Sequence, residues 1–159
     1  MKSVIKHQYN TNIEWTGNSG SGTSDYNAYK RNYQIAVDGK PDIQGSSDPA
    51  FKGDSSKYNP EELFVASISS CHMLWYLHLC SVNDIVVLQY KDCAEGIMVE
   101  NKDGSGQFEK ITLNPTVTVQ DKSMVELANT LHRQANQKCF IANSCNFEII
   151  HKAKTTSKE

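Results

Sequence analysis

The stretch that decides the fold runs from Asn59 to Cys80, NPEELFVASISSCHMLWYLHLC. It opens with asparagine, a preferred N-cap residue, then proline at the first helical position and two acidic residues in the first turn. Apolar side chains follow on nearly every side, which is typical of a helix enclosed by other elements. We therefore predict a central helix over residues 59–80.

Residues 1–58, before this helix, are predicted to form short strands joined by loops. Asp38 and Gly39, followed by Lys40, make a strong two-residue hairpin turn. The segment 16–30 is rich in Gly, Ser, Asn and Asp, which indicates a surface loop. The strands expected on this basis span residues 4–8, 12–15, 33–37 and 41–44.

Residues 85–151, after the central helix, are predicted to add strands and a second helix. Ser123 and Glu126 have the spacing of a capping box, and the apolar stripe of the helix that they open ends at an inward-facing Cys139. The polar tail 152–159 is expected to be frayed. The strands expected here span residues 85–90, 94–99, 107–119 and 145–151. The third of these strands is expected to break at Pro115.

This order of elements indicates an α+β fold in which mostly antiparallel sheets pack around two long helices. The 159 residues fit a single domain over 1–159, and 38% hydrophobic residues are typical of a globular protein. A formal charge of −2 gives no electrostatic reason to bind nucleic acid or an anionic membrane. We therefore expect a small or neutral partner, no nucleic acid and no membrane.

The sequence also indicates the cellular compartment in which the protein is expected. The first residues lack the apolar region of a secretory signal. The most apolar stretch, residues 64–80, contains three serines and two histidines and is shorter than the roughly 20 residues of a membrane span. Five cysteines form an odd count without a compact framework spacing, which favours a reducing compartment and one or more working thiols. We expect a cytoplasmic protein.

Two of these thiols are candidates for redox chemistry. Cys71 lies inside the central helix after a run of small residues, where a cysteine by default is a packed hydrophobe. Cys139 ends the second helix, so two buried helices each supply an inward-facing thiol, which supports a cycle between dithiol and disulfide. A reactive thiol also needs a nearby cation. Of the two arginines, Arg133 is expected to face solvent, so Arg31 is the better candidate.

The block NPEELF at residues 59–64, the six residues VASISS, then Cys71, together with the later Cys139, resembles the osmotically inducible protein C and organic hydroperoxide resistance (OsmC/Ohr) family. The likeness covers about residues 4–150. It implies an intertwined α+β homodimer that reduces organic hydroperoxides, with active sites at the subunit interface. It also implies that dithiols, lipoylated proteins among them, reduce the oxidised form, with no bound cofactor and no metal.

The resemblance implies a role for each matching residue. Cys71 corresponds to the peroxidatic cysteine, Cys139 to the resolving cysteine, Arg31 to the active-site arginine, and Glu61 to the carboxylate that orients it. Glu61 and Cys71 are ten residues apart on one helix, about 15 Å. An arginine that touches both therefore requires either a broken helix or residues from two chains, and we predict the second. Phe140 follows Cys139 where the family commonly has proline, and His72 follows Cys71 where an apolar residue is common, so we expect a divergent branch.

Three other interpretations stay open beside this one. The same pocket could bind an apolar ligand without catalysis, or the thiols could exchange disulfides with a partner protein. A metal site is disfavoured because its candidates lack the ligand spacing of a closed zinc site. Those candidates are Cys71, His72, Tyr76, His78 and Cys80.

Overall fold

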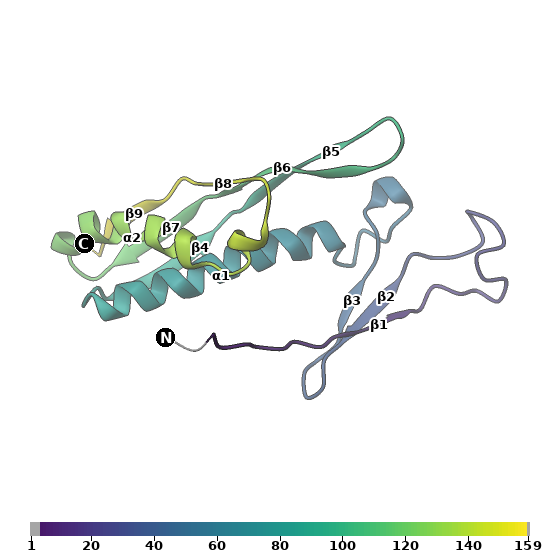
Figure 1. Ribbon diagram of the computed structural model, residues 1–159, viewed down its shortest axis with the longest axis horizontal. Coiled ribbons are helices and arrows are strands. Elements are labelled where there is room, and N and C mark those ends of the chain that lie inside the picture. The colour runs from purple at the N-terminus through teal and green to yellow at the C-terminus, as the bar shows by residue number, and fades with distance from the viewer. Residues whose placement is uncertain (1–3, 159) are drawn as a thin grey trace. The chain divides into compact units, whose positions relative to one another are not determined.

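The computed structural model describes residues 4–158 and has the predicted α+β architecture (Figure 1). The sequence predicted one domain over residues 1–159, of which 1–3 and 159 lie outside the described residues. The structure divides the chain into two compact units, one ending at Leu63 and one beginning at Phe64. We describe each unit by itself.

The N-terminal unit contains one antiparallel sheet in the order β1-β2-β3, with Ile13 opposite Ile35 and Ile35 opposite Ile43. Residues 4–8 form no strand, so that prediction was wrong: Val4 and Ile5 are exposed, and no neighbouring strand binds their backbone groups. The elements are β1 (Asn12–Trp15), β2 (Tyr33–Ala36), β3 (Ile43–Gly45) and the short 3-10 helix η1 (Pro49–Phe51).

Helix α1 (Pro60–Val82) confirms the predicted central helix and extends it by two residues. Its start is a capping box: the Glu62 N–H donates to Asn59 Oδ1 at 2.7 Å, and the Asn59 N–H donates to Glu62 Oε2 at 3.1 Å. At 23 residues it is long and apolar enough to cross a bilayer, a test that buried core helices also pass. One face of α1 is buried within the protein, through Ile68, His72, Tyr76, Leu79 and Cys80.

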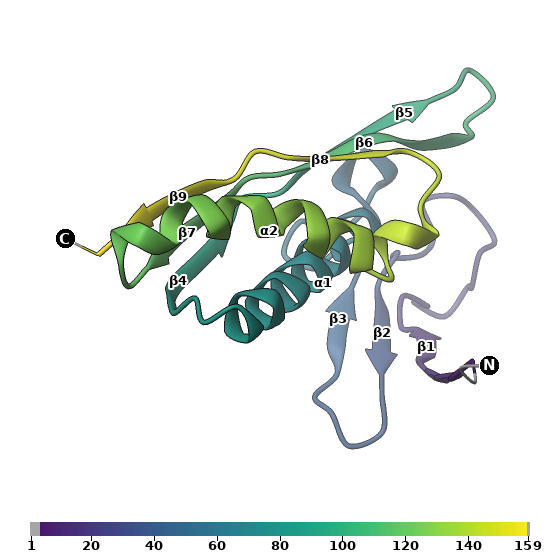
Figure 2. The ribbon, with the colours of Figure 1, turned by 60° about the vertical axis from the view of Figure 1, so that its left-hand side comes forward.

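The C-terminal unit holds two further sheets, ordered β4-β7-β9 and β5-β6-β8, with helix α2 beside α1 (Figure 2). Antiparallel pairs join β4 to β7 and β5 to β6, whereas β8 pairs with β6 and β9 with β7 in parallel. The elements are β4 (Val87–Asp92), β5 (Glu95–Glu100), β6 (Gly106–Leu113), β7 (Pro115–Val119), η2 (Lys122–Met124), α2 (Val125–Lys138), η3 (Ala142–Ser144), β8 (Glu148–His151) and β9 (Lys154–Ser157).

Two hydrophobic clusters form the core of this unit. In one cluster α1, α2 and β7 meet, with Tyr76, Val117 and Leu131 fully or almost fully buried. In the other, Ile68 of α1 packs on Ile111 and Leu113 of β6. The core therefore lies between the helices and the inner strand of each sheet.

Three local predictions for this region were wrong. The tail is not frayed, because its backbone pairs with the buried strand β7 and forms β9. Asp121, rather than Ser123, caps the turn before α2, since its carboxylate accepts the Ser123 N–H at 2.9 Å. The final strand begins at Glu148 rather than Cys145, because η3 occupies the preceding residues.

Candidate active site

Cys71 lies in the middle of α1 and is half-buried. The serines around it form local contacts: Ser70 Oγ donates to the Ser67 carbonyl at 3.2 Å, and Ser69 Oγ donates to the Asp92 carboxylate at 2.6 Å. The latter contact ties this turn of α1 to β4. Cys71 therefore lies on a fixed helical turn and is partly open to solvent.

Cys139 is fully buried at the C-terminal end of α2, where it caps the helix. Its backbone N–H donates to the carbonyls of Ala135 and Asn136, and its sulfur accepts the Ala142 N–H at 3.3 Å. Burial, and then the neighbouring Cys71 thiol, raise the pKa of the Cys139 thiol to about 11. The fold thus brings two thiols from separate helices into the same region, and both are free.

Aromatic side chains lie next to both cysteines. Trp75, one turn after Cys71, packs edge-to-face on Phe140, which directly follows Cys139, with ring centroids 5.8 Å apart. The Lys138 ammonium lies 5.5 Å from the centre of the Trp75 ring. Phe140 is 67% exposed, so this aromatic pair presents apolar surface to solvent.

Arg31 is held by the loop that precedes β2. Its guanidinium donates to the Tyr26 and Tyr29 carbonyls, both at 2.7 Å, and lies 4.2 Å from the centre of each of their rings. Arg31 belongs to the N-terminal unit and Cys71 to the C-terminal unit.

Glu61 lies in the first turn of α1, where its Oε2 atom is buried without a hydrogen-bond partner among the described residues. Burial, followed by the charge of Glu61, raises the pKa of Tyr33. Within residues 4–158 the one ion pair joins Lys57 to Asp54, so no pair between Arg31 and Glu61 forms within a single chain.

Three histidines, which the sequence patterns did not bring together, form a group around α1. His72 Nε2 lies 3.0 Å from His132 Nδ1, and the two rings are stacked with centroids 5.3 Å apart. His151 of β8 also stacks on His72, with centroids 5.3 Å apart, and Tyr76 stacks on His132 at 3.9 Å. A signal was present in α1, because His72 shares the i, i+4 spacing of the buried Ile68 and Tyr76.

Burial keeps these imidazoles neutral at neutral pH. It lowers the pKa of His72 to about 3, helped by repulsion from His132 and His151. It lowers the pKa of His132 to about 4 and also lowers the pKa of His151. In the described part of the chain, no group of three or more His, Cys, Asp or Glu side chains could hold a metal ion.

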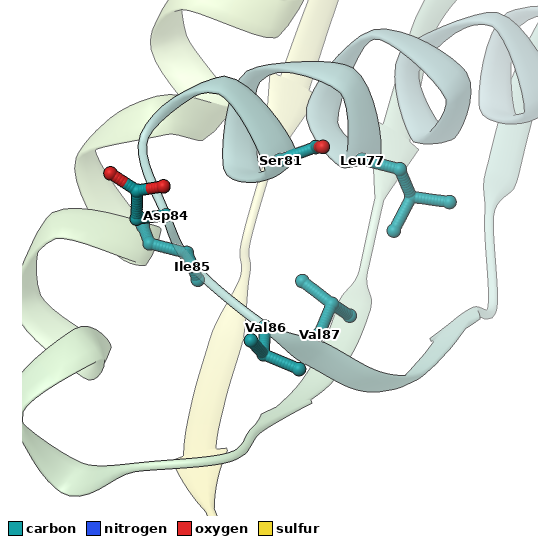
Figure 3. A pocket seen from close by; sticks show the side chains of 6 residues that line it. All are labelled: Leu77, Ser81, Asp84, Ile85, Val86 and Val87. Carbon is teal, nitrogen blue, oxygen red and sulfur yellow. The ribbon is translucent and has the colours of Figure 1, made fainter.

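A separate hollow lies at the C-terminal end of α1, where Leu77 and Ser81 face the segment leading into β4 (Figure 3). Its only carboxylate among the described residues is that of Asp84. None of the predicted site residues lines this hollow, so it is not part of the candidate active site around the two thiols.

Comparison with known proteins places the chain among related folds. The family model described as OsmC-like protein matches residues 53–153. An OsmC-like protein of unknown function from Vibrio cholerae is 29% identical, with a TM-score of 0.84 over 94% of this chain and 100% of that one. An organic hydroperoxide resistance protein from Elizabethkingia anophelis is 20% identical, with a TM-score of 0.68 over 97% of this chain and 100% of that one. Another from Legionella pneumophila is 18% identical, with a TM-score of 0.67 over 95% of this chain and 99% of that one. No curated protein matches the sequence.

Proposed function

Because the chain belongs to the OsmC-like protein family, we propose that it is a thiol-dependent peroxidase that reduces organic hydroperoxides. Proteins of the same fold include several named for organic hydroperoxide resistance. The observation that carries the proposal is the proximity of the Cys71 and Cys139 thiols, which come from different helices and lie near enough for Cys71 to raise the pKa of Cys139.

The surroundings of the two thiols support a different role for each. A thiol with a pKa of about 11 is ionised in roughly one molecule in ten thousand at pH 7, so Cys139 is a poor first nucleophile. It is also fully buried, whereas Cys71 is partly exposed and can be reached by a peroxide. Cys71 is therefore the peroxidatic cysteine and Cys139 the resolving one.

The proposed reaction has two steps. The Cys71 thiolate attacks the outer peroxide oxygen, the O–O bond breaks, and the alkoxide takes a proton to leave as an alcohol. The Cys71 sulfenic acid is then attacked by Cys139 sulfur, which loses its proton as the hydroxyl departs, so water leaves and a disulfide forms. An external dithiol, such as the lipoyl group of a protein, restores both thiols. No bound cofactor takes part.

The exposed aromatic pair supports an organic substrate. Trp75 and Phe140 flank the two cysteines and offer apolar surface to the alkyl group of a hydroperoxide. Hydrogen peroxide has no alkyl group to place there. We therefore expect a preference for alkyl hydroperoxides.

We further propose that the protein is a cytoplasmic homodimer. In this dimer the Arg31 guanidinium contacts Glu61 of one subunit and Cys71 of the other. Helix α1 is unbroken between these two residues, so they are about 15 Å apart along it and one guanidinium cannot touch both on the same helix. The buried, unpartnered Glu61 Oε2 needs a donor, and the two carbonyl contacts of Arg31 leave three of its five N–H groups free. Exposed apolar side chains on α1, Leu74 and Val82, also favour a second copy.

The test is peroxidase turnover with a dithiol reductant, followed by mass spectrometry after one equivalent of alkyl hydroperoxide. Cys71→Ser should abolish turnover, and Cys139→Ser should give one turnover and then overoxidation of Cys71. Cys93→Ser, at an exposed cysteine, is the matched control and should behave like the wild type. Lack of turnover in the wild type would instead favour an apolar-ligand binder, and disulfide exchange without peroxide selectivity would favour a redox partner protein.

The dimer has its own test. Activity per subunit should fall when the protein is diluted until it is monomeric, since each site then lacks its arginine. Full activity in the monomer would contradict the shared site.

A further inference from the structure

Between α2 and the last two strands lies a polar hollow that the proposed reaction does not use. Its mouth carries two cationic side chains, Arg133 of α2 and Lys154 of β9, with Asn129 beside them. Its inner wall includes His132, His151 and Thr155. None of the described residues that line it is acidic. The adjoining hollow, which shares Asn129, contains one acid and one base, Glu126 and Lys122.

Buried polar atoms without partners belong to this wall. His132 is only 4% exposed, and its Nε2 atom has no hydrogen-bond partner among the described residues. The same holds for His151 Nε2. Buried polar atoms are normally satisfied, so two imidazole nitrogens without partners beside one hollow indicate a missing ligand.

The contact between His72 and His132 links the tautomers of the two rings. A hydrogen bond between the facing nitrogens requires a proton on one of them, and a neutral imidazole has a single N–H. If His72 Nε2 donates, the proton of His132 is on Nε2; if His132 Nδ1 donates, His132 Nε2 is an acceptor. An anion held by the cationic mouth of the hollow selects the first arrangement, because only that arrangement offers the anion a donor N–H.

From this geometry we propose that the hollow binds a dianionic phosphate group, free or carried by a small organic molecule. Arg133 and Lys154 supply the charge, and His132 and His151 supply neutral hydrogen bonds deeper in the site. The bound oxyanion fixes the tautomer of His132 with its proton on Nε2. Neither Cys71 nor Cys139 takes part, so this proposal stands or falls independently of the peroxidase.

The test is calorimetric titration of the full chain with inorganic phosphate, acetate and glycerol 3-phosphate at constant ionic strength. Saturable one-to-one binding of a phosphate compound, tighter than acetate, is expected. Arg133→Gln combined with Lys154→Gln should weaken it at least roughly tenfold, because two charge-assisted contacts are lost. Lys152→Gln removes an exposed cation that does not line the hollow and should leave binding unchanged.

A nitrogen NMR titration gives a second readout. Phosphate should move the His132 Nε2 resonance toward the protonated position in the wild type and in Lys152→Gln, but not in the double variant. Tighter binding of glycerol 3-phosphate identifies an organic phosphate as the ligand, and tighter binding of the inorganic ion identifies free phosphate; both support the site. Unsaturable binding, acetate binding as tightly, equal binding by the double variant, or binding without a change at His132 would each overturn it.

Discussion

Acid should destabilise this protein well above the pH at which carboxylates titrate, because three imidazoles are buried in their neutral form. The folded protein lowers the pKa of His72 to about 3 and that of His132 to about 4, and also lowers the pKa of His151. In the unfolded chain each has an ordinary value of about 6.5. The unfolded state therefore binds more protons below pH 6.5, so stability is full above that pH and falls as the pH is lowered.

The size of the effect follows from these values. From pH 7.5 to 5 an imidazole that stays neutral in the folded state costs about 2 kcal/mol in total, because the loss approaches about 1.4 kcal/mol per pH unit only below pH 6.5. His72 and His132 together should thus remove about 4 kcal/mol, and His151 acts in the same direction. That is a large share of the roughly 5–15 kcal/mol that stabilises a typical domain.

The assay is urea unfolding at several pH values between 5 and 7.5, with the free energy of unfolding extrapolated to water. Carboxylates contribute little in this window, because their ordinary pKa values are about 4. The shifted aspartates lie lower still, namely Asp25, Asp54, Asp103 and Asp121. His72→Gln should reduce the loss by about 2 kcal/mol. His78→Gln, at an exposed histidine, is the control and should keep the wild-type slope.

A wild-type loss below about 1 kcal/mol over this range would refute the reasoning, because it would mean that water or counter-ions reach the imidazoles in the folded state. If the free energy of unfolding of His72→Gln depends on pH as steeply as that of the wild type, His72 does not contribute to the acid destabilisation.

Three other substitutions test the cap, the aromatic pair and the core. Asn59→Ala removes the side-chain oxygen that accepts the Glu62 N–H and should cost about 1 kcal/mol in urea unfolding, whereas the same change at the exposed Asn10 should cost nothing measurable. Phe140→Ala should raise the KM for a bulky alkyl hydroperoxide severalfold and leave hydrogen peroxide turnover unchanged; an equal effect on both substrates would show that the ring does not contact the alkyl group. Ile111→Ala, at a fully buried position, should destabilise the protein by about 2–5 kcal/mol, and a loss below about 1 kcal/mol would contradict the packing around β6.

The best sequence predictions concern features set by neighbouring residues. Asn59 and Glu62 form the predicted cap of α1, and Pro115 separates β6 from β7 as expected. Gly39 occupies the left-handed region, with φ of 74°, in the predicted hairpin turn. Each of these features depends on contacts within a few residues, which a sequence displays directly.

The wrong predictions concern segments whose conformation depends on distant partners. Residues 154–157 look like a polar tail, yet they form β9 because the backbone of β7 is free to pair with them. Residues 4–8 were predicted to form a strand, yet no neighbouring strand pairs with them. In both segments the availability of a pairing edge overrides local composition.

For the candidate site, the sequence by itself determined which helix carries Cys71, that Cys139 faces inward at the end of a second helix, and that the family is OsmC-like. Only the tertiary structure decided that these thiols are neighbours, and that His72, His132 and His151 stack in one group. The reason is physical: helix periodicity fixes the direction of a side chain relative to its own axis, whereas the distance between side chains on different elements depends on how those elements pack.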